Sequence, residues 1–165
     1  MSENTGSVSG NVSDAANDAI LTEWEQKDRD HSHRLAELLE INKAVLFEAM
    51  IAAGITMITI EFDGYGDEGQ VEDALAYAGD TQIAMPNDQI EIIDAKWGVL
   101  DVERQMVTVG EAVEAMAWAI LGRLHGGWQD GEGAFGEFEF DVATRTITLD
   151  FNERYTETTN YTHEL

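Results

Sequence analysis

Residues 135–151 read FGEFEFDVATRTITLDF, and apolar side chains alternate with polar ones on both sides of a short polar stretch. Alternation with a period of two is typical of a β-strand that buries one face. We therefore expect a β-hairpin, with strands at residues 135–141 and 145–151 and a turn at residues 142–144. The face that both strands turn toward the core is predicted to hold Phe138, Phe140, Ile147, Leu149 and Phe151.

The opposite face of this hairpin is acidic. Glu137, Glu139 and Asp141 alternate with the phenylalanines, and Asp150 projects the same way from the second strand. Alternate residues on a strand lie roughly 6.6 Å apart, so the first three carboxylates form an evenly spaced row. Such a row resembles the charge of a nucleic-acid backbone, which basic grooves bind through Arg and Lys. The alternative is an ordinary solvated sheet face, whose charge discourages edge pairing.

A second hairpin is predicted upstream. Residues 56–63 form its first strand, with Ile58, Ile60 and Phe62 on one face. Residues 64–69 are a tight, acidic, glycine-rich connection. Residues 70–77 return as an antiparallel strand that turns Val71, Leu75 and Tyr77 inward, although helical spacing competes as an interpretation there. A further strand is expected at residues 91–97.

Helices are predicted on either side of this hairpin. The chain turns helical from Asp14, and after the charged stretch at residues 27–33 an amphipathic helix runs from Leu35 to Met50 and ends at Gly54. Thr108 and Glu111 have the spacing of a capping box, which begins another helix that stops at His125. The buried stripe of that helix is predicted to be Val113, Met116, Ala117, Ile120 and Leu124.

These elements predict an α+β fold. We expect one antiparallel sheet made of two hairpins, with about four or five strands, packed on one face by two or three helices. Residues 1–12 are rich in Ser, Asn and Gly and are predicted to be a disordered leader. Residues 13–165 are expected to form a single α+β domain.

The composition restricts the partners. The chain of 165 residues holds 33 Asp and Glu against 9 Lys and Arg, a net charge of -24. Such a surface repels nucleic acids and anionic membranes and attracts cations or basic protein surfaces. The absence of cysteine excludes disulfides, zinc ribbons and thiol nucleophiles. No apolar run approaches the roughly 20 residues of a membrane helix, and we expect a cytoplasmic protein.

Two acidic loops suggest a metal site as an alternative. Asp63 and Asp67 lie in DGYGDEG, and Asp130 and Glu132 lie in WQDGEG. With His125 as a general base, these side chains could serve a hydrolase that depends on Mg²⁺, Ca²⁺ or Mn²⁺. Ordinary turn chemistry explains the same residues, and neither loop has the spacing of an EF-hand. No catalytic motif occurs, so we expect no cofactor.

Three motifs resemble a bacterial family without an assigned function, which occurs on plasmids and mobile elements. They are FDGYGDEGQVED at residues 62–73, HGGWQDGEGAFGEFEFD at residues 125–141 and TITLDFNERYTETTNYTHEL at residues 146–165. The resemblance implies a compact domain with a functional patch near the glycine-rich loops, serving a mobile element against a host system. It supplies no catalytic residues. Glu68 adds a charge where the family has a small hydroxyl.

We therefore expect a non-enzymatic inhibitor or adaptor that engages a basic, nucleic-acid-binding site on another protein and does not itself bind nucleic acid. A nucleic-acid mimic of the anti-CRISPR or anti-restriction type is its most specific form. A homodimer through the helix at residues 35–50, or through an exposed sheet edge, stays open. The predicted partner-binding residues are Glu137, Glu139, Asp141 and Asp150, with Asp63, Asp67 and Glu68 as a second cluster.

Overall fold

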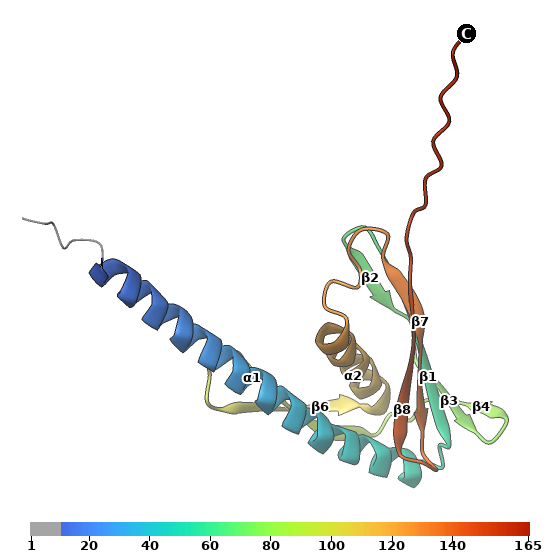
Figure 1. Cartoon of the computed structure of the whole chain (residues 1–165). Helices are drawn as coiled ribbons and strands as arrows, with labels where there is room; N and C mark the ends of the chain where they lie inside the picture. The colour runs from blue at the N-terminus through green and yellow to red at the C-terminus, as the bar shows by residue number, and fades with distance from the viewer. Residues whose placement is uncertain (1–10) are drawn as a thin grey trace, which may run out of the picture. The chain divides into compact units, whose positions relative to one another are not determined.

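The computed structural model describes residues 11–165 (Figure 1). The described chain divides into two compact units. The first comprises residues 11–40 with 93–104, and the second comprises residues 41–92 with 105–165. Of the predicted leader, residues 1–10 lie outside the described residues, and Asn11 is already the first residue of a helix.

Helix α1 (Asn11–Ala52) is continuous, so the predicted interruption at residues 27–33 is wrong. Polar side chains there pair along the helix at a spacing of four residues. Lys27 lies 3.2 Å from Glu23, and His33 lies 3.1 Å from Glu37. Such pairs support a helix, and no Gly or Pro interrupts it. The predicted end is confirmed, because Gly54 adopts φ +72°.

The main sheet lies in the second unit and confirms the α+β class. Its order is β4-β3-β1-β7-β8, with β2 also pairing β1, and the strand pairs are antiparallel. The strands are β1 (Met57–Tyr65), β2 (Glu68–Val71), β3 (Leu75–Ala78), β4 (Thr81–Ile83), β7 (Ala134–Asp141) and β8 (Thr146–Glu153). Strand β1 therefore joins the two predicted hairpins, since it pairs with β7 along eight residues.

The predicted strand at residues 70–77 is two strands, β2 and β3, and the break between them reverses the side-chain alternation. Val71 faces inward as predicted, opposite Phe62. Leu75 instead lies opposite Thr59 on the outer face and is 41% exposed, while Ala76 lies opposite Ile58 and is buried. The predictions of Leu75 and Tyr77 as inward-facing are therefore wrong, and so is the competing helix.

Helix α2 (Val109–Leu124) contacts β1 and β2 (Figure 1). The capping box at its start is confirmed: the Thr108 amide donates to Glu111 Oε2 at 2.8 Å, and the Glu111 amide donates to Thr108 Oγ1 at 3.2 Å. Leu124 was predicted to be buried but is 60% exposed, because Leu121 takes the inward position one turn earlier. The largest fully buried side chains of this unit are Leu46, Phe47, Met50, Ile55, Ile58, Ile60, Phe62, Leu121, Phe138 and Phe140.

Strands β5 (Gln89–Ala95) and β6 (Val102–Thr108) form a separate two-stranded sheet. Strand β5 overlaps the strand predicted at residues 91–97, whereas β4 and β6 were not predicted. In the first unit, the rings of Trp24 and Trp97 lie 6.1 Å apart, and both side chains remain about half exposed. Within the described residues, no helix is long and apolar enough to span a membrane.

Candidate interaction site

The open face of the main sheet carries a row of carboxylates across three strands. Glu137 on β7 lies directly opposite Glu61 on β1 and opposite Asp150 on β8. Directly opposite side chains on one face of an antiparallel pair have Cβ atoms about 4.5–5.5 Å apart. These three residues line a groove of about 700 Å³. We call it the acidic groove; its carboxylates are Glu61, Asp63, Glu72, Asp73, Glu137 and Asp150.

The charges in the acidic groove affect one another. Partial burial raises the pKa of Glu137 above its ordinary value of 4.5, and repulsion from Glu139, Glu61 and Asp150 raises this pKa further. The Glu137 carboxylate therefore lies where negative charge is already concentrated. A basic side chain from another molecule would relieve that repulsion.

The predicted row along β7 is present on this face. Glu139 lies opposite Thr59 and Thr148, and Asp141 lies at the end of the strand opposite Met57 and Thr146. The row therefore continues from the groove toward the hairpin turn, flanked by neutral side chains. Asp141 also has a local role, because its Oδ1 accepts a hydrogen bond of 3.2 Å from the Thr144 amide.

The second predicted cluster is only partly joined to the first. Asp63 lines the acidic groove together with Glu137 and Asp150, and its Oδ1 lies 3.0 Å from Nη2 of Arg154. Asp67 and Glu68 are exposed at the turn between β1 and β2 and do not line the groove. The structure thus brings Asp63 to the row and leaves the other two at the loop.

The two glycine-rich motifs pack against each other through Trp128. This side chain is 6% exposed and meets the ring of Phe62 edge to face, with centroids 5.4 Å apart. A Cβ atom at Gly64 would lie 2.6 Å from the Trp128 ring, and one at Gly69 would lie 2.7 Å from it. Only glycine allows this approach. Close packing against Trp128 therefore explains why glycines occur in DGYGDEG, without a bound metal.

Arg154 completes this junction from the end of β8. Its Nη1 donates a 3.0 Å hydrogen bond to the carbonyl of Gly64, and its guanidinium lies 4.6 Å from the centroid of the Phe135 ring. With the ion pair to Asp63, one side chain connects the β1–β2 turn to β7 and β8. Arg154 is consequently a structural residue at the rim of the acidic groove.

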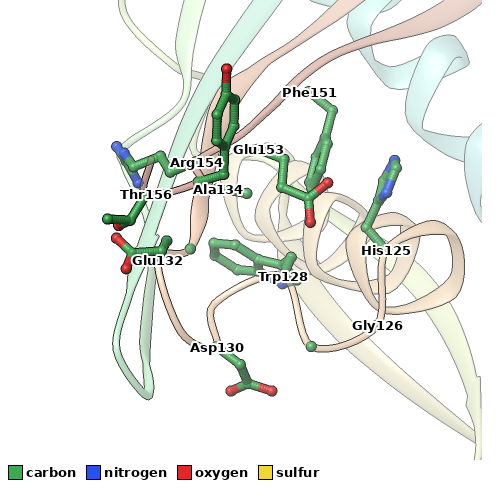
Figure 2. A pocket seen from close by; sticks show the side chains of 13 residues that line it. His125, Gly126, Trp128, Asp130, Glu132, Ala134, Phe151, Glu153, Arg154 and Thr156 are labelled. Atoms are coloured by element: carbon green, nitrogen blue, oxygen red, sulfur yellow. The ribbon is translucent and has the colours of Figure 1, made fainter. Parts of the chain in front are cut away.

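A second cavity, of about 500 Å³, lies beside the loop after α2 (Figure 2). His125 is the C-cap of α2, and its ring stacks on Phe151 with centroids 3.6 Å apart. In Figure 2 the carboxylates of Asp130, Glu132 and Glu153 point in different directions.

The alternative metal set is not gathered into one site. Among residues 11–165, no group of three His, Asp or Glu side chains could hold a metal ion. Asp63 is instead paired with Arg154, and Asp130 and Glu132 line the cavity beside His125. The metal-dependent hydrolase therefore stays a prediction. Within the described residues, its proposed ligands do not come together in one site.

Three members of the acidic groove were not predicted from the sequence: Glu61, Glu72 and Asp73. Glu61 lies on the outer face of a correctly predicted strand, so its orientation was available from the alternation. Its position opposite Glu137 was not available, because pairing of β1 with β7 joins segments more than seventy residues apart. Glu72 and Asp73 lie in the break between β2 and β3.

The fold and groove define a class: an α+β protein with helix α2 against its main sheet and an open, acidic sheet face. The chain belongs to DUF6878, a family of unknown function that matches residues 38–165. No curated protein and no solved structure matches the chain. The expected membership of a family without an assigned function is confirmed, and the matched region includes the acidic groove, both glycine-rich loops and the C-terminal residues.

Proposed function

We propose that this protein is a non-enzymatic inhibitor or adaptor whose acidic groove binds a basic, nucleic-acid-binding site on another protein. The observation that carries the proposal is the row formed by Glu61, Glu137 and Asp150 across three neighbouring strands. Several carboxylates on one open sheet face can accept hydrogen bonds from several Arg or Lys side chains at once, as the phosphates of a nucleic acid do.

The charge balance of the second unit supports this proposal. Residues 41–92 and 105–165 contain only four of the nine Lys and Arg, and two of these four are already paired. Arg145 pairs with Glu48, and Arg154 pairs with Asp63. Most carboxylates of the unit are thus left for counterions or a partner. Attraction of this kind raises association rates and falls with added salt.

The more specific form of the proposal is a mimic of nucleic acid that acts in the cytoplasm for a mobile element, against a host defence enzyme. Its support is the spacing of Glu137, Glu139 and Asp141 along β7, roughly 6.6 Å from one residue to the next. A defence enzyme that binds nucleic acid has a basic groove of the required sign, since phosphate contacts dominate such binding.

The experiment is capture from a nuclease-treated bacterial lysate with the tagged protein as bait, washed at low and at high salt and read by mass spectrometry. The test bait reverses four charges of the face: Glu137→Lys, Glu139→Lys, Asp141→Lys and Asp150→Lys. The control bait reverses four exposed acids of α1: Asp14→Lys, Asp18→Lys, Glu25→Lys and Glu40→Lys.

The proposal expects a nucleic-acid-binding protein that the wild-type and control baits retain at low salt and that the test bait loses. Both variants change the net charge equally, so a difference between them reports the face and not the total charge. Equal retention by the test and control baits would refute the role of the acidic face.

A further inference from the structure

The C-terminal residues 155–165 continue from β8 in an extended form (Figure 1). We call them the tail. Tyr155 and Tyr161 are 83% and 77% exposed. Within the described residues, the only hydrogen bond of the tail is internal, from the side-chain Nδ2 of Asn160 to the Thr162 hydroxyl. Four threonines and two tyrosines give the tail a strand-forming composition. No strand among residues 11–165 pairs with it.

The main sheet has an open edge next to the tail. Strand β8 ends the sheet order, and β7 is its only partner in the part of the chain that the structure describes. The Arg154 amide donates to the Gly133 carbonyl across β7, at 2.9 Å. Backbone groups alternate in direction along a strand. The odd-numbered residues of β8 therefore direct their N–H and C=O groups to the open edge, which is available for another strand.

We propose that two copies of this chain pair through β8 and the tail, antiparallel around a two-fold axis, so that each tail covers the β8 edge of the other copy. The tail and the open edge of β8 belong to one continuous segment. A single two-fold contact therefore gives both of them a pairing partner at once. The contact uses the same surface on both copies and closes on itself, so it produces a dimer and not a fibre. This inference does not depend on the proposed function.

The side chains favour one register, with Thr156 on the axis. Phe151 then lies opposite Tyr161 of the second copy, and Ile147 lies opposite Leu165 of the second copy. Both pairs fall on the face that carries Phe138, which extends the apolar layer past the half-buried edge of β8. No two carboxylate side chains are opposite each other in this register.

Three neighbouring registers, with axes at Arg154, Tyr155 and Glu157, bring like charges together. With the axis at Arg154, the Arg154 side chains of the two copies lie opposite each other. With the axis at Glu157, the two Glu157 carboxylates lie opposite each other. An axis at Tyr155 places Glu153 opposite Glu157 of the second copy. Directly opposed like charges are destabilising in a sheet. Of the four registers with an axis from Arg154 to Glu157, the one around Thr156 is thus the one that opposes no like charges and also pairs apolar side chains.

The test is the mass in solution, measured by light scattering during gel filtration and by sedimentation equilibrium, against 18.2 kDa for one chain. Since each copy carries a charge of -24, the measurement is made at low salt and at about 0.5 M NaCl, where repulsion is screened. We expect twice the monomer mass, with a dimer fraction that rises with salt.

Two proline variants of the tail provide a matched pair. In the proposed ladder the Thr159 N–H faces the second copy, and the Thr158 N–H faces away from it. Proline removes the N–H, so Thr159→Pro should weaken dimerisation at least about tenfold, while Thr158→Pro should change it by less than about threefold. The tail packs little against its own chain, so both variants should retain the thermal unfolding of the subunit.

A wild-type chain that stays at the monomer mass at about 200 µM and 0.5 M NaCl would overturn the proposal. A dimer that Thr159→Pro leaves unchanged, or that both variants weaken equally, would overturn it as well, since the contact would then lie elsewhere or have another register.

Discussion

Replacing Glu137 by glutamine should stabilise the protein at neutral pH. Glu137 lies opposite Glu61 on one side and Asp150 on the other. Two directly opposed like charges of this kind cost roughly 0.2–1 kcal/mol each, so removing the central charge should gain about 1 kcal/mol. For a chain of 165 residues this corresponds to a rise in Tm of roughly 2–4 °C.

The stability gained by Glu137→Gln should increase as the pH rises. Because the pKa of Glu137 is raised in the folded state, the native protein binds this proton more tightly than the unfolded chain does. The unfavourable contribution of the carboxylate therefore develops as the pH rises from 4.5 through the raised pKa. The advantage of Glu137→Gln should be full at pH 7 and vanish below about pH 4.5.

The assay is thermal unfolding of the wild type, Glu137→Gln and the control Glu114→Gln, which removes the same charge from an exposed position on α2. Each is measured at pH 7 and pH 4, at low salt and at about 1 M salt, where the Debye length falls to about 3 Å. The Tm of Glu137→Gln should exceed that of the control only at pH 7 and low salt. Equal Tm values for the two variants there would refute local repulsion across the three strands.

The loop junction and the helix cap lead to further predictions. Gly64→Ala should lower the free energy of unfolding by about 1–3 kcal/mol, because its Cβ would lie 2.6 Å from the Trp128 ring. The control Gly122→Ala in α2 meets no atom within 4 Å and should raise it by roughly 0.5–1 kcal/mol. Urea unfolding measures both, and an unchanged stability for Gly64→Ala would contradict the close contact. Arg154→Ala should cost about 1–3 kcal/mol, since it removes the hydrogen bond to the Gly64 carbonyl and a cation–π contact, and Arg154→Lys should recover only part of this. Thr108→Ala should cost about 1 kcal/mol by removing a side-chain acceptor, with Thr108→Ser close to wild type; equal losses in both would argue against the capping hydroxyl.

Local signals predicted most of the elements. The alternation at residues 135–151, the cap at Thr108 and the end of α1 at Gly54 depend on neighbouring residues, and these predictions are confirmed. Leu75 was misplaced because a short break after β2 reverses the alternation, which no local pattern reveals.

The site was harder to predict than the strands. Glu137, Glu139, Asp141 and Asp150 were found because one strand pair positions them. Glu61 was missed because its contact with Glu137 arises from pairing between distant segments. The glycine-rich motif around Gly64 was interpreted as an acidic loop, since nothing in its composition indicates that the Trp128 ring packs against its glycines.

The most direct test of the central claim is competition for the captured partner between this protein and a fluorescent DNA or RNA duplex, followed by anisotropy at a fixed low salt concentration. If the acidic groove occupies the basic site, the wild type should displace the duplex, and the variant with Glu61→Gln, Glu137→Gln and Asp150→Asn should need at least about tenfold more protein. A partner that binds the wild type while retaining its duplex would contradict the claim.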